Sequence, residues 1–448
     1  MIEQEFLSCY YRPAFFKMKI DLHTDLSNLN EISDGAFSLY LHEYIHFIQD
    51  ISTIYGLMNI STINYYLQDC AHRIHKEGLK EFQVPFSLRN DKDDFGFNNF
   101  QLRPIYIGSP INPKHTFISI DSYQLINNKF GSGELDIVQE VLVYFTNNES
   151  SDLQSFKLGG NHITEGMAFL CESYIYSDIL SQQGHTITAD EYPYKVVKKL
   201  AEQIYPELSN YDILIIAICD NSLMTYHPGL SYVRLLEELK RIDFINRYSE
   251  NEEIITELYK IAIPFLKGNH YDFNIILDTV RSEIKKSFKV EHFEGNNQWI
   301  DIIFDRIKAF REKRPEFLID IILLGDPKKN ELFGAFHKLI GSPLVINADY
   351  EGTISIPTGF DPKNFHPYLF WAINQLLRIF SDNKPTPCEL IDYCKKSKVV
   401  DEKIIIDDRC YNSPWKRYND DNLCPMGIMW KHWSLAGFEP KKNKKNSR

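Results

Sequence analysis

The chain has 448 residues, which is enough for two or three domains and a large buried core. Its composition is that of an ordinary globular protein, with 44% hydrophobic and 25% charged residues, and its formal net charge is -12. This acidic balance argues against a general nucleic-acid-binding protein, which carries a basic face, and the basic run Lys441–Arg448 is expected to be a solvated tail.

Membrane-spanning and secreted proteins are also disfavoured. No run approaches the roughly 20 apolar residues that span a bilayer, and residues 1–20 lack a basic segment followed by an apolar one. The eight cysteines are scattered without a C-x-x-C pair, which is typical of free thiols in a reducing compartment. We therefore expect a cytoplasmic protein that binds neither membranes nor nucleic acids.

The first elements expected along the chain are a strand at Phe15–Ile20 and a buried helix after Ser33. Ser33 is a typical helix N-cap, and the residues from Ala36 to Ile51 are apolar on nearly every side of the helix. The helical period of apolar residues continues to about Glu77, which predicts a second helix.

Residues 79–150 change in character and predict a strand-bearing insertion. Short β-like runs occur at Ile105–Ile107 and Phe117–Ile120, and Gly131–Gly133 suggests a turn. After a loop in which Asn161 is the expected cap, a helix is predicted from Thr164 to near Gly184.

The remaining pattern is mostly helical. A β-hairpin is expected at 344–356, followed by a helix from about Pro367 to Ser381. We divide the chain into a core of residues 1–240, a helical region 241–383 and a cysteine-containing segment 384–448. The other expected helices are Tyr194–Ile204, Asp212–Thr225, Tyr232–Ile242, Glu253–Phe265, Ile275–Ser287 and Trp299–Ala309.

Two histidines lie four residues apart in His42-Glu43-Tyr44-Ile45-His46, the pattern H-E-x-x-H. On a helix this spacing places both imidazoles on one face, one turn apart, where both can bind the same metal ion. Glu43 then points beside the ion, where a carboxylate can accept a proton from a metal-bound water. The alternative is two core histidines that are hydrogen-bonded to neighbouring carbonyl groups.

A catalytic zinc ion usually has three protein ligands and a water molecule. The extended pattern that supplies a third histidine fails, because Gln49 and Ser52 occupy the positions of its glycine and its histidine. The other option is a glutamate from a later helix. The stretch Glu165–Ala168, with the sequence E-G-M-A, fits because its small residues allow close helix packing. With these two stretches the chain resembles the zincin metallopeptidases, specifically those of the gluzincin type.

This resemblance implies a zincin-like catalytic core in which His42, His46 and Glu165 bind one zinc ion and Glu43 is the general base. Zinc lowers the pKa of its bound water toward about 7, so hydroxide is available at neutral pH. Two alternatives stay open. The only role of Glu165 can be a favourable interaction of its carboxylate with the positive N-terminal end of the helix dipole. Glu172, on the same face of the helix, is either the third ligand or a hydrogen-bond acceptor for a histidine.

Such a site usually needs a donor for the oxyanion of the tetrahedral intermediate. Tyr226 and His227 are candidates because they follow an apolar helix and precede Pro228, with Asp220 available to orient a histidine. We assign this catalytic role to His227, although the dipole alone also favours a histidine at a helix terminus. His162 is a weaker candidate of the same kind.

The C-terminal segment offers a second metal site. Cys388, Cys394, Cys410 and Cys424, together with His432, are the residue types of a structural zinc site. Their spacings of 6, 16 and 14 residues match no common zinc finger. Isolated thiols packed in the core are therefore the preferred interpretation.

The sequence thus predicts an α+β, predominantly α-helical protein with zinc-dependent peptidase activity on a protein or peptide substrate. Two alternatives remain. One is another metal-dependent hydrolase with the same ligands. The other is a non-catalytic helical scaffold that binds a protein partner and whose metal is structural or absent. Neither the substrate nor the oligomeric state follows from the sequence.

Overall fold

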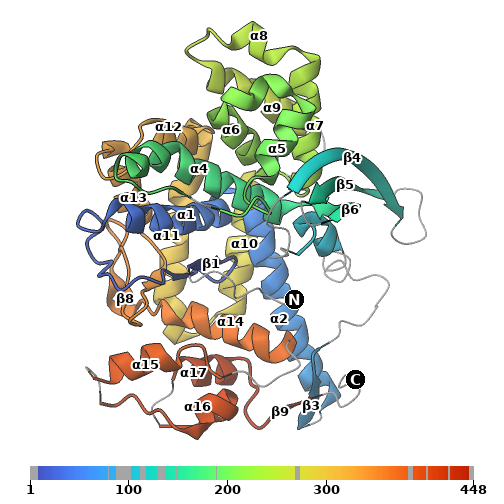
Figure 1. Ribbon diagram of the computed structural model, residues 1–448. Helices are drawn as coiled ribbons and strands as arrows, with labels where there is room; N and C mark the ends of the chain where they lie inside the picture. Colours follow the sequence, from blue (N-terminus) through green and yellow to red (C-terminus); the bar gives the residue numbers. More distant parts are fainter. Residues whose placement is uncertain are drawn as a thin grey trace.

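Helix α1 (Asp34–Ser52) runs through the middle of the computed structural model beside helix α4 (Gly160–Gln182), as Figure 1 shows. As expected, Ser33 caps α1, because its side chain accepts a hydrogen bond from the amide of Ala36. Nearly every residue of α1 is buried, so the helix and its polar side chains belong to the core.

Thr53 separates α1 from helix α2 (Ile54–Glu77) and holds both ends. Its hydroxyl donates to the carbonyl of Gln49 at 2.7 Å and accepts from the amide of Gly56 at 3.0 Å. A Cβ on Gly56 would lie 2.4 Å from the Cα of Asp50, so only glycine permits this close turn. The predicted second helix is confirmed.

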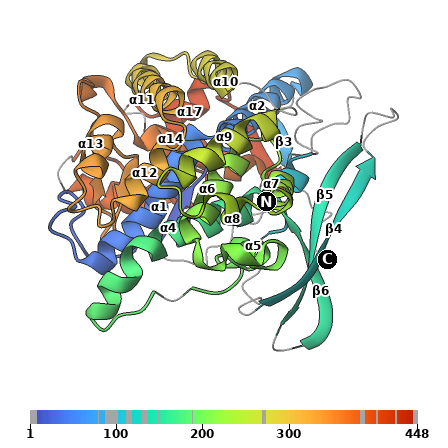
Figure 2. The ribbon, with the colours of Figure 1, turned by 90° about the horizontal axis from the view of Figure 1, so that it is seen from above.

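The antiparallel sheet β4 (Ile118–Lys129), β5 (Ile137–Asn147) and β6 (Ser150–Leu158) leads directly into α4. Figure 2 shows this sheet at one side of the helical body. The strand expected at Phe117–Ile120 is confirmed at residues 118–120, residue 117 lies outside the described residues, and the sheet continues past residue 150. The turn expected at Gly131–Gly133 lies outside the residues that the structure describes.

Two expectations around this sheet are wrong. Residues 102–107 are helical, not extended, because a three-residue apolar run does not distinguish strand from helix. Helix α4 is capped by Gly159 rather than Asn161 and begins at residue 160. A Cβ on Gly159 would lie 2.2 Å from the amide nitrogen of Gly108, so this glycine fixes where β6 ends.

Each of the other expected helices is present, some with ends shifted by a few residues. The short helices α8, α12, α13, α15, α16 and α17 were not predicted, because their apolar pattern covers too few turns. The helices after α4 are α5 (Val196–Ile204), α6 (Asp212–Leu223), α7 (Pro228–Arg241), α8 (Phe244–Tyr248), α9 (Ile254–Lys267), α10 (Phe273–Ser287), α11 (Glu294–Lys313), α12 (Phe317–Leu323), α13 (Glu331–Ile340), α14 (Tyr368–Ser381), α15 (Ile391–Lys398), α16 (Asp408–Asn412) and α17 (Pro425–His432).

Two small sheets join distant parts of the chain. The first has the order β1 (Tyr10–Arg12), β2 (Lys17–Lys19), β7 (Leu344–Ile346) and β8 (Gly352–Thr353), with β2 parallel to β7. In the second, β3 (Glu81–Val84) pairs with β9 (Glu439–Lys442). The expected strand near Lys17 and the expected hairpin β7–β8 are both confirmed.

The protein is mixed α+β and predominantly α-helical, as predicted. One apolar core contains residues from Tyr11 to Leu435, so the three expected segments pack together, and their boundaries stay a prediction. No helix in the described ranges is long and apolar enough to cross a bilayer. These ranges are 9–78, 80–86, 102–110, 118–129, 137–147, 150–187, 189–267, 273–381, 387–399, 402–421 and 424–442.

Candidate metal centre

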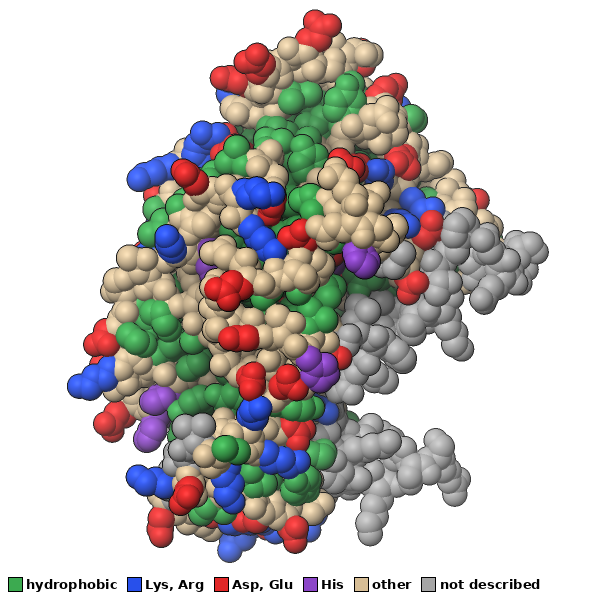
Figure 3. Space-filling view, turned by 60° about the vertical axis from the view of Figure 1, so that its left-hand side comes forward, with side chains coloured by type: hydrophobic (Ala, Val, Ile, Leu, Met, Phe, Trp, Pro, Cys, Tyr) green, Lys and Arg blue, Asp and Glu red, His purple; other side chains and the backbone are tan. Residues whose placement is uncertain are grey.

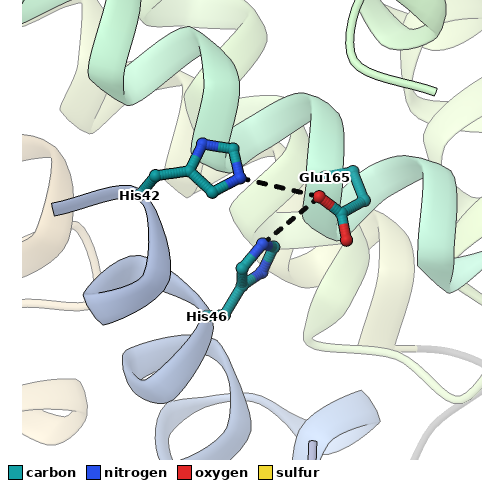
Figure 4. A group of neighbouring side chains, drawn as sticks. All are labelled: His42, His46 and Glu165. Carbon is teal, nitrogen blue, oxygen red and sulfur yellow. Dashed lines mark ion pairs between the residues drawn. The ribbon is translucent and has the colours of Figure 1, made fainter. Parts of the chain in front are cut away.

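Helices α1 and α4 bring His42, His46 and Glu165 together (Figure 4). The two imidazole rings lie one helical turn apart, with their centroids separated by 5.1 Å. Oε2 of Glu165 lies 3.6 Å from Nε2 of His42 and 3.3 Å from Nε2 of His46. The candidate ligand atoms of the three residues all lie within 4.8 Å of one another.

These distances fit a tetrahedral metal ion. Zinc binds imidazole nitrogen and carboxylate oxygen at about 2.1 Å, so neighbouring ligand atoms are about 3.4 Å apart at the tetrahedral angle. The two contacts of Glu165, at 3.3 and 3.6 Å, lie on either side of that value. Two nitrogens and one oxygen also leave the fourth position free for water, as in catalytic zinc sites.

The Nδ1 atoms of both histidines face away from this group and bind side chains behind it. Nδ1 of His42 lies 3.0 Å from Oε2 of Glu172, whose other oxygen accepts a hydrogen bond from Ser38. Nδ1 of His46 lies 2.8 Å from the amide oxygen of Gln49. An Nδ1–H that donates to such an acceptor leaves Nε2 with its lone pair, the form of histidine that binds a metal.

These contacts bear on two alternatives that the sequence left open. Glu172 contacts the outer nitrogen of His42, which is the place of a hydrogen-bond acceptor behind a ligand rather than of a ligand. The nitrogens of both histidines contact carboxylate and amide side chains, which is not the pattern of core histidines that are hydrogen-bonded to backbone carbonyls. Gln49 also links the two helices of the site, because its amide nitrogen donates a hydrogen bond to the backbone carbonyl of Thr164 on α4.

Without an ion, the group favours positive charge. Burial alone would lower the pKa of His42, but its hydrogen bonds with Glu165 and Glu172 raise that pKa to about 10. The pKa of His46 is raised in the same way by Glu165, against the effect of burial. Burial would raise the pKa of Glu165, but the two histidines hold it well below its usual range. A divalent cation bound between these three side chains would supply the positive charge that the protonated histidines otherwise carry.

Glu43 is buried on the same turn of α1 as His42. Burial raises the pKa of Glu43, while the neighbouring His42 and His46 and the backbone amide of Tyr11 partly lower it. A carboxylate with a raised pKa is a stronger base at neutral pH than an exposed one. Glu43 therefore lies on the helical turn that carries His42 and has the raised basicity that a general base needs.

Tyr194 is a site residue that the sequence analysis missed. Its ring meets the ring of His42 edge-on, with 5.8 Å between centroids. Burial and the charges of Glu165, Glu43 and Glu172 raise the pKa of its hydroxyl, so the hydroxyl keeps its proton. No recorded hydrogen bond within the described ranges occupies that hydroxyl. No motif marks Tyr194, because it comes from the segment before α5 and reaches the site only through the fold.

The contacts of His227 do not bring it to the group. Its Nε2 lies 2.6 Å from the carbonyl oxygen of Gln139 on β5, and its Nδ1 accepts a hydrogen bond from the amide of Leu230 as the cap of α7. Burial lowers its pKa to about 4, so the ring is neutral. His227 thus joins a helix end to the sheet, and this geometry supports no contact with a substrate at the metal centre.

His162 also has internal partners. It is fully buried, with Nε2 2.9 Å from the hydroxyl of Tyr192 and Nδ1 accepting a hydrogen bond from the amide of Gly159. Both nitrogens are therefore used in holding the start of α4.

Comparisons with models of protein families, with curated proteins and with solved structures found no match to this chain.

Proposed function

We propose that this protein is a zinc-dependent metallopeptidase of the gluzincin type that hydrolyses peptide bonds of a protein substrate. The observation that carries the proposal is the convergence of Nε2 of His42 and of His46 on Oε2 of Glu165, with buried Glu43 beside them. The contacts of Glu172 and Gln49 support it, because they direct both Nε2 atoms toward the same point.

His42, His46 and Glu165 would hold the zinc ion, which when bound would supply Lewis-acid polarisation of the scissile carbonyl and a water molecule of lowered pKa. Glu43 accepts a proton from the attacking water at its carboxylate and later donates it to the leaving amine. Tyr194 takes the role that His227 was expected to fill: its ring lies beside the ring of His42, and its hydroxyl keeps the proton that a donor to the oxyanion needs.

A protein substrate is proposed in preference to nucleic acid. On the face drawn in Figure 3, acidic and basic side chains are interspersed rather than gathered by sign. Binding to a phosphate backbone needs a concentrated basic surface, and the net charge of the chain is -12. The proposed place of action is the cytoplasm, where the free cysteines would stay reduced.

The proposal is tested by comparing the cleavage products of a whole proteome after incubation with the wild-type protein and with Glu43→Gln. The wild type should carry zinc and produce new peptide termini. The variant should keep its zinc, measured by elemental analysis, and produce none of these termini. Glu207→Gln is the matched control, because Glu207 is exposed on a 3-10 turn away from the group.

The outcomes also separate the alternatives. Zinc that is bound by a protein without new termini, but with turnover of a small ester or phosphoester that Glu43→Gln abolishes, would indicate another hydrolase. A wild-type protein that neither contains zinc nor gains activity from it would indicate a scaffold.

A further inference from the structure

The four C-terminal cysteines lie on one small part of the fold. The amide of Cys388 donates a hydrogen bond to the carbonyl of Cys410 at 2.9 Å, which joins the first and third cysteines through the backbone. Cys394 lies on α15. Cys388 and Cys394 both pack against one apolar cluster, formed by Leu344, Ile346, Trp371 and Leu390.

A second chain of contacts joins Cys410 to Cys424. A guanidinium nitrogen of Arg417 donates to the sulfur of Cys410 at 3.2 Å. Arg417 lies on the short helix η4 (Pro414–Asn419), which packs tightly on the start of α17. A Cβ on Gly427 would lie 2.8 Å from the carbonyl oxygen of Arg417. Cys424 caps α17, and its sulfur accepts a hydrogen bond from the amide of Gly427 at 3.4 Å.

Donors from η4 and from α17 are thus directed at two of the four sulfur atoms. Arg417 is 1% exposed, so its charge is buried beside Cys410. The backbone hydrogen bond between Cys388 and Cys410, together with the contacts of Arg417 with Cys410 and with the start of α17, holds these cysteines in one region of the fold. A cation bound between thiolates of one region would offset their mutual repulsion.

We propose that Cys388, Cys394, Cys410 and Cys424 bind a second zinc ion as four thiolates and that this ion stabilises the C-terminal segment. Binding breaks four S–H bonds, releases the protons to solvent and forms four Zn–S bonds. The site then carries two net negative charges, which the guanidinium of Arg417 partly offsets.

The ion must draw the sulfur atoms inward. Among the described residues, only the His42–His46–Glu165 group brings three candidate ligand atoms within 4.8 Å of one another. The cysteines lie on loops and on helices of five to eight residues, which can shift more easily than the long helices of the core. His432 is not a fifth candidate, because its Nε2 lies 2.7 Å from the carbonyl oxygen of Ser287.

The architecture of this segment gives the ion a structural role. It consists of short helices and turns, it contributes only Leu390 to the buried residues of the small apolar cluster, and its other buried apolar residues, such as Trp415 and Trp430, belong to the main core. Small segments with little apolar core of their own commonly depend on a metal ion or disulfides for stability. Metal binding here would couple directly to folding.

The experiment measures zinc in the purified full-length chain. The wild type should contain about two zinc ions per chain. His46→Ala should lose about one and keep the cysteine-bound ion, whereas the double variant Cys410→Ser, Cys424→Ser should lose the other. Cys9→Ser is the control, because Cys9 is a half-buried thiol outside this cluster. This design keeps the two sites separate, so either proposal can fail alone.

Cobalt substitution gives a second readout that does not depend on the stability of the variants. Cobalt in a four-thiolate site shows intense thiolate-to-metal charge-transfer absorption, which the His42–His46–Glu165 group cannot produce. This absorption should persist in His46→Ala and disappear when a mercurial reagent blocks the thiols. The proposal is overturned if the wild type lacks the absorption. It is also overturned if non-reducing mass spectrometry shows these cysteines paired as disulfides.

Discussion

Oε2 of Glu172 lies 3.0 Å from Nδ1 of His42, while Oε2 of Glu165 lies 3.6 Å from Nε2 of the same ring. Two carboxylates of one helix therefore hold one imidazole from both sides. The removal of such an acceptor behind a ligand typically weakens metal binding about 10–100-fold. We expect this loss of zinc affinity in Glu172→Gln, measured by competition with a chelator. An affinity equal to that of the Glu207→Gln control would contradict this role for Glu172.

Glu165→Ala should have a larger effect than Glu172→Gln, because it removes a ligand atom rather than its support. We expect less than stoichiometric zinc in the purified variant when zinc is measured after dialysis. A variant that retains its zinc, while Glu172→Ala loses it, would show that Glu172 is the third ligand.

Tyr194→Phe should reduce turnover without removing zinc. The loss of one oxyanion donor commonly lowers kcat about 100–1000-fold. The substitution keeps the ring that packs against His42 and deletes only the hydroxyl. Tyr174→Phe is a suitable control, because Tyr174 is an exposed residue of the same helix as Glu165. Full activity of Tyr194→Phe would exclude the hydroxyl from the chemistry.

Arg311→Met should destabilise the whole fold. Arg311 donates to both carboxylate oxygens of Asp220 at 2.7 Å and to the carbonyl of Ser52 at the end of α1, all within the core. The loss of one partner of a buried ion pair costs about 3–5 kcal/mol, because the other charge stays buried. Urea unfolding should show this loss. The exposed pair of Arg241 provides the comparison, and Arg241→Met should leave the free energy of unfolding almost unchanged, because solvent screens an exposed ion pair.

Acid should weaken the attachment of the C-terminal segment through Glu389. Burial would raise the pKa of Glu389, but Lys17, Arg12 and Arg378 hold it at about 2, against an ordinary value of 4.5. A lowered pKa in the folded state stabilises the protein above the ordinary value, and this stability is lost as the pH falls from about 4.5 toward 2. The full contribution is on the order of 3 kcal/mol.

Urea unfolding at pH 6 and at pH 3 measures this effect in the wild type and in Glu389→Gln. The wild type should be the more stable of the two at pH 6, and the difference should shrink at pH 3. A difference that does not change with pH would assign the stabilisation to packing rather than to the charge of Glu389.

Local patterns predicted the two helices of the candidate site. The cap at Ser33 and the apolar period of α1 are properties of adjacent residues, so the element and the positions of its histidines could be read directly. The grouping of Glu165 with these histidines agrees with the expectation that came from the E-G-M-A stretch.

The surroundings of the site could not be read in this way. Tyr194 contacts His42 only because separate helices pack together, and no spacing in the sequence records that contact. The assignment of a catalytic role to His227 failed for a similar reason. A histidine that caps a helix and one that faces a substrate have the same sequence neighbourhood, and only the hydrogen bond to Gln139 distinguishes them.

The pairing of β2 with β7 has a consequence for synthesis of the protein on the ribosome. Lys17 and Leu344 are partners in one sheet, and Arg311 binds the end of α1, so the surroundings of the first ligands are completed only after residue 346 has been made. At about 5–20 residues per second, that delay is on the order of 15–60 s. A nascent chain therefore carries the two histidines long before the packing around α1 is in place, so the proposed peptidase activity would begin only after residue 346 has been made.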